Sequence, residues 1–204
     1  MKLLAFKCSI LVGGFAILTS PLFCGQQTLA VESGSPEGRQ IAAIEHETDV
    51  AKKQALLEDF AKAASSKSLS SWAYAQMQGL YLQGQQFDKA LEAGQLAFTL
   101  DPNNLDAAYA CLKASESKSD AAALIEWAGE THRIAAKPLE SATADPNNAA
   151  RTDYLKQVAN YADYSLFAAS MKTTEPPKII ALVEALEQQN PASPYLGQAY
   201  GRYL

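Results

Sequence analysis

The sequence has few cysteines and few histidines, and this limits the covalent and metal chemistry it can carry. Three cysteines and two histidines occur in 204 residues, and Cys111 is the only cysteine beyond residue 30. A lone cysteine excludes an internal disulfide in that part of the chain. His46 and His132 lie far apart and do not form the His-Glu-x-x-His pattern of zinc proteases. A zinc site needs three or four ligands, so we expect no metal and no cofactor.

The sequence also lacks the short motifs that mark common catalytic sites. It contains no Gly-x-Ser-x-Gly, no Cys-x-x-Cys and no phosphate-binding glycine loop. Adjacent acids such as Glu58 and Asp59 point about 100° apart on a helix, so they do not form a catalytic pair. We therefore expect no catalytic residues and no enzymatic activity.

Positive charge is scarce and is not concentrated anywhere. The chain holds 17 Lys and Arg against 22 Asp and Glu, a formal net charge of −5. Lys52-Lys53 is the one basic pair of note, and it fits a solvated helix face. Binding to nucleic acid or to an anionic membrane surface depends on clustered Lys and Arg. The composition therefore excludes nucleic acid as an expected partner.

The N-terminal thirty residues have the pattern of a bacterial-type secretory signal. Lys2 and Lys7 precede an apolar run at 8–18, and a more polar stretch ends at Ala30. The run is shorter than the roughly 20 residues of a membrane-spanning helix. We expect cleavage near Ala30 and a periplasmic or secreted protein. Two alternatives are lipidation at Cys24, which the bulky Phe23 disfavours, and a retained anchor.

What the chain does have is helix-forming residues and regular punctuation. Ala, Leu, Gln, Glu and Lys are frequent, and no alternating strand pattern is bounded by hairpin turns. Asp-Pro-Asn-Asn occurs at 101–104 and again at 145–148, which indicates a repeated unit. The punctuation predicts helices beginning near Pro36 and after Thr48-Asp49, then over 72–83, 87–100, 105–115, 120–136, 147–171, 178–189 and from Pro194 onward.

The segment 74–102 resembles a tetratricopeptide repeat. Residues of the family's type occupy the family's places at Tyr74, Met77, Tyr81, Phe87, Ala90, Ala97 and Pro102. Two positions depart from it, since Gln78 stands in the glycine place and Gly94 in the second-helix aromatic place. The resemblance implies an all-α fold in which antiparallel helix pairs stack as a short right-handed solenoid. The implied units are 71–104, the weaker 36–64, 105–138 and 146–191, and a capping helix at 194–204.

The resemblance also implies a binding surface, because the first helix of each pair lines a concave groove in that family. Carried over, the partner-binding residues are Trp72, Gln83, Asp106, Tyr109 and Lys113. Only Lys113 suits the carboxylate clamp of some family members, so no such clamp is expected. The alternative is that Trp72 and Tyr109 pack between helices.

A second aromatic group lies along the predicted helix 147–171. Tyr154, Tyr161, Tyr164 and Phe167 recur at near-helical spacing. Such a stripe is more often part of a core than a surface that binds a peptide or a sugar chain.

The sequence therefore predicts an exported scaffold that mediates protein–protein interaction by binding a partner protein or an extended peptide on its concave surface. The alternatives are an envelope enzyme or cell-wall hydrolase accessory with an unrecognised site, and a self-assembling structural protein. Fold alone does not decide among them, because function must be argued from the site.

Overall fold

The computed structural model describes residues 31–32, 34–141 and 149–202. The predicted signal at 1–30 and the second Asp-Pro-Asn-Asn at 145–148 lie outside these residues. The described part of the chain is all-helical and contains no strand. Its helices are α1 (Pro36–His46), α2 (Val50–Ala63), α3 (Lys67–Gln83), α4 (Phe87–Leu100), α5 (Leu105–Lys118), α6 (Ala121–Ser141), α7 (Ala149–Lys172), α8 (Pro176–Gln189) and α9 (Leu196–Tyr200).

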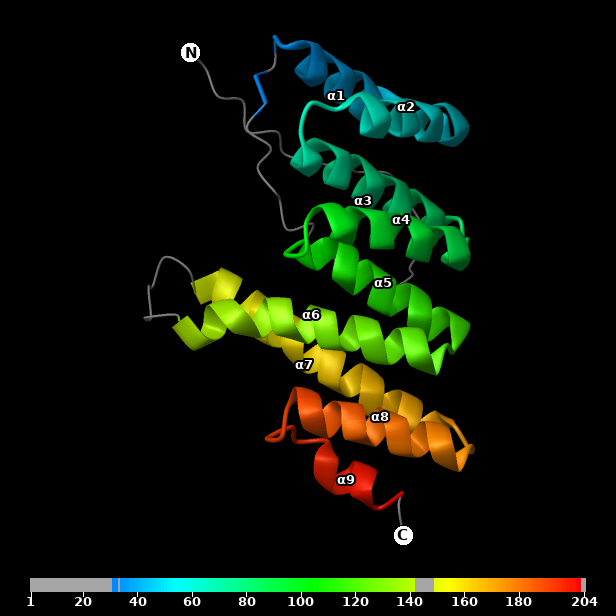
Figure 1. The fold of residues 1–204 in the computed structure, drawn as a ribbon, viewed down its shortest axis with the longest axis vertical. Coiled ribbons are helices and arrows are strands. Elements are labelled where there is room, and N and C mark those ends of the chain that lie inside the picture. Colours follow the sequence, from blue (N-terminus) through cyan, green and yellow to red (C-terminus); the bar gives the residue numbers. More distant parts are fainter. Residues whose placement is uncertain (1–30, 33, 142–148, 203–204) are drawn as a thin grey trace, which may run out of the picture.

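The helices follow one another along the long axis of the molecule in chain order, from α1 at one end to α9 at the other (Figure 1). Every helix packs against the next one in sequence. Alternate helices also touch, because α3 contacts α5, α5 contacts α7, and α7 contacts α9. Among the described elements, α3, α5, α7 and α9 thus form a continuous row of adjacent helices.

The helix starts predicted for α1 and α2 are confirmed, and both follow from capping. Ser35 accepts a hydrogen bond from the backbone N–H of Gly38 at 2.9 Å, and Pro36 occupies the first turn. Asp49 accepts from the backbone N–H of Lys52 at 2.9 Å. These side chains satisfy backbone donors that have no partner inside the helix.

The serines before Trp72 suggest a joint over 64–71, but only 64–66 lie between α2 and α3 and the rest is helical. α3 begins at Lys67, and Ser66 caps it by accepting from the backbone N–H of Leu69 at 3.3 Å. The Ser70 hydroxyl donates to the carbonyl of Ala61 in α2 at 2.9 Å. Serines have modest helix propensity, but here their hydroxyls make a cap and a link between two helices.

Two further boundaries differ from prediction between α5 and α6. α5 continues past Ser115 to Lys118, and the buried Ser115 hydroxyl donates to the Cys111 carbonyl within the helix at 2.9 Å. Ser119 directly precedes the predicted helix 120–136 and is a cap candidate by sequence, but it lies in the left-handed region with φ of 56° and ends α5. The cap of α6 comes from Asp120, which accepts from the backbone N–H of Ala123 at 3.1 Å.

Pro138 does not end α6, contrary to the prediction that the helix stops at Ala136. The helix runs on to Ser141. A proline inside a helix removes one hydrogen bond and crowds the carbonyl four residues earlier, at a local cost of about 3 kcal/mol. α6 packs along α7, and this tertiary packing outweighs the local preference. The other late boundaries move by a few residues, with α8 beginning at Pro176 and α9 at Leu196.

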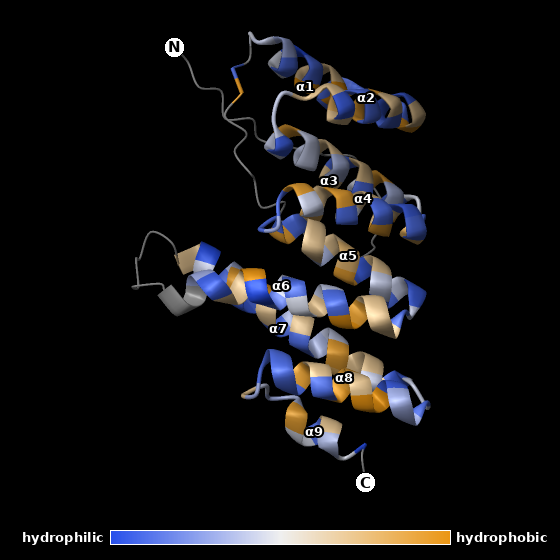
Figure 2. Ribbon diagram, in the orientation of Figure 1, coloured by the Kyte–Doolittle hydropathy of each residue, from blue (hydrophilic) through white to orange (hydrophobic). Residues whose placement is uncertain are grey.

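The buried side chains form two main clusters along the stack. One joins α1 to α4 and includes Ile44, Leu57, Phe60 and Met77. The other joins α5 to α9 and includes Leu112, Trp127, Leu166, Leu182 and Leu186. Each helix has both polar and apolar residues along its length (Figure 2). In the described part of the chain, none of the helices combines the length and the apolar character needed to cross a membrane.

The two departures from the repeat pattern compensate for each other in space. Gln78 is 1% exposed and fills the position opposite Gly94, where an added Cβ would lie 2.1 Å from its Nε2 atom. That amide donates to the Ala107 carbonyl and to the Cys111 sulfur, both at 3.1 Å. The tetratricopeptide pattern has a small residue at the position of Gln78 and a large one at the position of Gly94. Here the large residue lies on α3 and the small one on α4, so the space between the two helices is still filled.

The turn at 101–104 recurs at 190–193 with a different sequence. In both turns a side chain accepts from a backbone N–H two residues later at 3.1 Å, Asp101 from Asn103 and Asn190 from Ala192. The first residues also share their backbone angles, with φ of −140° and ψ of 92° at Asp101 and φ of −149° and ψ of 89° at Asn190. The fourth residues, Asn104 and Ser193, are both buried. The same turn therefore joins α4 to α5 and α8 to α9.

Candidate functional site: a tyrosine face on α5, α7 and the turn before α9

Five aromatic rings form a connected group across neighbouring helices. Tyr109 on α5 contacts Tyr161 on α7, with ring centroids 5.5 Å apart, and Tyr161 lies 6.4 Å from Tyr164. Tyr164 in turn lies 5.7 Å from Tyr195, whose ring stacks on Phe167 at 5.3 Å and 15° between planes. We call this group, Tyr109, Tyr161, Tyr164, Phe167 and Tyr195, the tyrosine face.

Helical periodicity explains why α7 presents these rings together. Tyr161, Tyr164 and Phe167 are three residues apart, so successive side chains are neighbours on the helix surface. Residues between them, such as Ala162 and Leu166, are fully buried in the core. Tyr164 is 46% exposed, whereas the other rings of the face are half-buried. One side of α7 thus packs inward while the other carries the aromatic rings.

A group of polar side chains joins α5 to α7 next to the rings. Glu116 accepts from the Lys113 ammonium at 2.7 Å, from the Tyr161 hydroxyl at 2.7 and 2.9 Å, and from Ser165 at 2.5 Å. The Lys113 ammonium also donates to the Tyr161 hydroxyl and lies 4.7 Å from the centroid of that ring. Both carboxylate oxygens of Glu116 therefore have donors within the protein.

These contacts stabilise the charged forms of Lys113 and Glu116. Burial by itself raises the pKa of Glu116, but hydrogen bonds from Lys113, Ser165 and Tyr161 outweigh it, so that pKa lies below its usual range. Burial likewise lowers the pKa of Lys113, and hydrogen bonds to Glu116 and Tyr161 reverse the effect, so that pKa is raised. The pair is charged at neutral pH and internally neutral.

The tyrosine hydroxyls of the face can both donate and accept hydrogen bonds. Among the described residues, the hydroxyls of Tyr109 and Tyr164 donate to no protein group, and both rings meet others only through ring contacts. The side chain of Lys113 is 42% exposed and uses two of its three N–H groups. The face combines aromatic area with hydroxyls that can donate or accept, while the Glu116 carboxylate already accepts from protein donors at both oxygens.

The residues predicted to bind a partner fall in separate places. Tyr109 and Lys113 meet at the tyrosine face. Trp72 instead packs edge-on against Phe60, 5.6 Å away, in the cluster that joins α1 to α4. Gln83 is exposed at the last residue of α3, and Asp106 is half-buried in the first turn of α5. The structure thus brings two of these five residues together.

A second polar group surrounds the buried carboxylate of Asp163 on the inner side of α7. It accepts from Gln189 and Asn190, each at 2.6 Å, and its Oδ1 lies 2.9 Å from Nδ1 of His132. Burial raises the pKa of Asp163, but the hydrogen bonds from His132, Gln189 and Asn190 outweigh it, so the pKa lies below its usual value. This carboxylate ties α6, α7 and the end of α8 together, which is a structural role.

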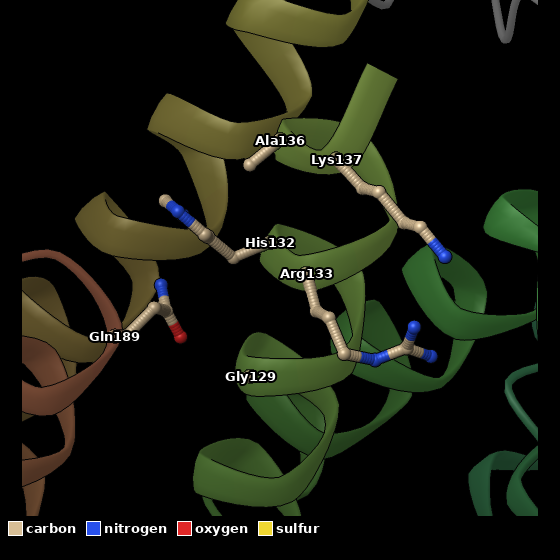
Figure 3. Close-up of a pocket in the computed structure, with 6 residues that line it drawn as sticks. All are labelled: Gly129, His132, Arg133, Ala136, Lys137 and Gln189. Atoms are coloured by element: carbon tan, nitrogen blue, oxygen red, sulfur yellow. The ribbon is translucent and has the colours of Figure 1, made fainter. Parts of the chain in front are cut away.

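An open hollow of about 470 Å³ lies beside His132. It is lined by five residues of α6, Gly129, His132, Arg133, Ala136 and Lys137, and by Gln189. Arg133 and Lys137 extend away from His132 and Gln189 (Figure 3), and the Arg133 guanidinium pairs with Glu130 at 2.6 Å. The polar groups of the hollow do not converge on a common point, so it lacks the arrangement of a ligand site.

The described residues contain no group of three or more His, Cys, Asp or Glu side chains placed to hold a metal ion. Cys111 is fully buried, and burial raises the pKa of its thiol to about 12, although the Gln78 amide acts in the opposite direction. A thiol in this state is a packing group rather than a nucleophile.

Sequence reasoning missed part of the tyrosine face. Tyr195 joins it through the turn before α9, and no spacing in the sequence links that turn to α7. Glu116 follows Lys113 by three residues and Ser165 follows Tyr161 by four, so helical spacing does place each beside its partner. Of the predicted aromatic stripe on α7, Tyr164 is exposed whereas Tyr154, Tyr161 and Phe167 are half-buried against the core.

Comparison with known proteins finds no matching family model, no matching curated protein and no matching solved structure.

Proposed function

We propose that this protein is an exported scaffold of the tetratricopeptide type, which binds a partner protein or an extended peptide on the surface formed by α3, α5, α7 and α9. The observation that carries the proposal is the tyrosine face, a partly exposed aromatic surface on this row. Exposed tyrosines give contact area at low conformational-entropy cost and are frequent at protein-binding surfaces.

Three features support a solenoid of helix pairs. Alternate helices touch from α3 to α9, as stacked pairs require. The matching turns at 101–104 and 190–193 place α5 and α9 at equivalent points after α4 and α8. Gln78 and Gly94 exchange their places in the pattern and preserve close packing, so the departures at these positions remain compatible with a repeat.

The surface is proposed for binding rather than catalysis because its charged groups satisfy one another. Glu116 receives donors at both oxygens, and a general base needs a free acceptor within reach of a substrate proton. The export signal proposed for residues 1–30 would place the surface in the cell envelope or outside the cell.

The test is affinity capture from envelope extract with the full chain and two variants. Tyr164→Ala removes the most exposed ring of the face, and Leu96→Ala removes a side chain of equal exposure (47%) on α4. Tyr164→Ala also loses ring contacts with Tyr161, Phe167 and Tyr195, each worth about 0.5–1.5 kcal/mol, so circular dichroism is used to check that both variants keep the native helix content. We expect a partner that is retained by the native chain and Leu96→Ala and lost with Tyr164→Ala. Equal retention by both variants would show that the tyrosine face is not the binding surface.

A further inference from the structure

We propose that the contact between His132 and Asp163 is a pH-sensitive clasp, which closes the junction of α6, α7 and the end of α8 when His132 is protonated. The clasp belongs to the folded chain alone, so it is independent of the proposed function and of any partner. Three properties support it: the burial of the carboxylate, the kind of donors around it, and the place of the histidine at the edge of an open hollow.

Asp163 is a buried carboxylate that three side chains of other helices and turns contact. Its side chain is 2% exposed. Oδ2 accepts from Asn190 at 2.6 Å, and Oδ1 accepts from Gln189 at 2.6 Å and lies 2.9 Å from Nδ1 of His132. Gln189 and Asn190 donate from neutral amides, whereas a histidine can carry a positive charge. Of these three contacts, His132 is the one that can supply a counter-charge.

The strength of this contact depends on whether the imidazole is charged. A histidine side chain has an ordinary pKa of about 6.5, so its charge changes close to neutral pH. The protonated ring of His132 gives Asp163 a charge-assisted hydrogen bond, which is about twice as strong as a bond from a neutral ring. The neutral ring leaves a buried anion with uncharged donors, and an uncompensated buried charge is costly.

Linkage gives the direction of the pH effect. Because protonation strengthens the contact in the folded protein, the stabilisation is present at mildly acid pH and is lost as the pH rises through the point where His132 gives up its proton. Opening of the junction lets water reach the carboxylate of Asp163. Loss of the proton therefore favours the open form.

The surroundings of His132 allow it to exchange protons with water. Its side chain is 16% exposed and lines the open hollow of about 470 Å³. Arg133 and Lys137 of the same helix also line this hollow, and both extend away from the histidine (Figure 3). Among the described residues that line it, α8 contributes the neutral Gln189, and α5 and α7 contribute none. The two cations oppose protonation of the ring, while the Asp163 carboxylate at 2.9 Å favours it.

Opening of the junction affects the turn after α8. Asn190 begins the turn 190–193 and accepts from a backbone N–H two residues later at 3.1 Å. The amide of the same side chain donates to Asp163 on α7. Tyr195 follows the turn and stacks on Phe167 of α7. The clasp therefore helps to hold the segment that brings Tyr195 to the tyrosine face.

The experiment measures hydrogen exchange by mass spectrometry on the full chain at about pH 6 and about pH 9, on either side of the ordinary histidine pKa. Each exchange rate is divided by the intrinsic rate at that pH. The native chain is compared with His132→Gln, which keeps a neutral donor, and with His46→Gln, which changes the other histidine of the chain at an exposed position.

We expect protection in the segment 186–195 of the native chain to be about fivefold lower at the higher pH, the ratio for replacing a charge-assisted hydrogen bond by a neutral one. His46→Gln should show the same change. His132→Gln should have the lower protection at both pH values, because its donor is never charged. The segment 36–63 of α1 and α2 serves as the internal reference and should not respond.

Three results would overturn the clasp. The first is equal protection of 186–195 at both pH values in the native chain. The second is a loss of protection that persists in His132→Gln, since another group would then be responsible. The third is an equal loss in 36–63, which would indicate unfolding of the whole chain.

A second measurement applies if circular dichroism shows that His132→Gln does not fold. NMR spectra of the native chain then follow the imidazole signals of its two histidines, His46 and His132, against pH. The pH at which protection of 186–195 falls by half its total change should coincide with the titration midpoint of His132. A midpoint that differs from it, or a His132 signal that does not titrate between the two pH values, would overturn the clasp.

Discussion

Asn104 shows how one residue can both start a helix and join neighbouring elements. Its side chain accepts from the backbone N–H of Ala107 at 3.0 Å, which caps α5, and donates to the Ser71 hydroxyl at 3.2 Å. That hydroxyl in turn donates to the Ala97 carbonyl at 2.8 Å. The last residue of the Asp-Pro-Asn-Asn motif therefore links α5, α3 and α4 in one buried chain of hydrogen bonds.

Replacing Asn104 by alanine should lower the free energy of unfolding by about 1–2 kcal/mol, because a helix cap and a buried partner of Ser71 are both lost. Urea unfolding followed by circular dichroism measures this. The control is Asn103→Ala at the exposed neighbouring position, which should change stability by less than about 0.5 kcal/mol. Equal effects at the two positions would mean that the buried chain of hydrogen bonds adds nothing.

Asp163 predicts a dependence of stability on pH. Its folded-state pKa is lowered relative to the unfolded value of about 3.9. The lowered pKa therefore stabilises the folded protein at any pH above the unfolded-state pKa. This stabilisation is lost as the pH falls through the folded-state pKa of Asp163. Asp163→Asn should thus be less stable than the native chain at pH 7 by about 1–3 kcal/mol, since Gln189 and Asn190 lose a carboxylate acceptor.

At pH 3 or below the difference between Asp163→Asn and the native chain should shrink, and urea unfolding at both pH values measures it. Asp153→Asn, at an exposed position of the same helix, is the control and should match the native chain at both. A difference that stays the same at pH 7 and pH 3 would contradict the role assigned to the Asp163 carboxylate.

At the scale of helices, we expect substitutions at Gln78 and Gly94 to have effects on the free energy of unfolding that are not additive. Gly94→Ala places a Cβ 2.1 Å from Gln78 Nε2 and 2.3 Å from Cys111 Sγ, so it should destabilise by about 1–3 kcal/mol through overpacking. Gln78→Ala removes the first of these clashes. The double variant should therefore be more stable than the sum of the two single effects indicates.

A double-mutant cycle with urea unfolding measures this coupling. The matched control pairs Gln78→Ala with Gly129→Ala, where an added Cβ meets nothing within 4 Å. That pair should be additive within about 0.5 kcal/mol. Additivity in the Gln78 and Gly94 pair would show that the two residues do not compensate for each other.

How far the sequence predicts these elements depends on which forces decide each one. Apolar periodicity and caps such as Ser35 and Asp49 are local signals, so the helix content and most helix starts are predicted correctly. The extension of α6 through Pro138 is not, because packing against α7 decides it. The start of α3 at Lys67 is not predicted, because serines are frequent both in loops between helices and at helix N-caps. Tyr109 and Lys113 are found through the family resemblance, while Tyr195 depends on the tertiary path of the chain.

For the whole molecule, the stacked arrangement predicts that damage at one end stays local. Phe60 is buried in the cluster of α1 to α4, and Phe60→Ala should cost about 3–5 kcal/mol. In a stack where units contact mainly their neighbours, stability is nearly a sum of local terms. Hydrogen exchange should therefore show lost protection in α1 to α3 while α7 and α8 keep theirs.

Leu182→Ala in α8 is the reciprocal variant, since Leu182 belongs to the other cluster. It should reduce protection in α7 and α8 and leave α1 to α3 close to native. If either substitution lowered protection equally along the whole chain, the molecule would unfold as a single cooperative body.

The exchange of sizes at Gln78 and Gly94 also bears on how the chain avoids folding into the wrong order. A protein made of many helices faces competition, because one helix could dock on several others of like shape. Gln78 fits only where the opposing helix offers a glycine and where the Ala107 carbonyl can accept its amide. An incorrect neighbour would meet a buried amide with neither space nor a partner. The buried Gln78 amide thus makes α3 specific for its neighbours, because α4 supplies the glycine and α5 supplies the carbonyl that it needs.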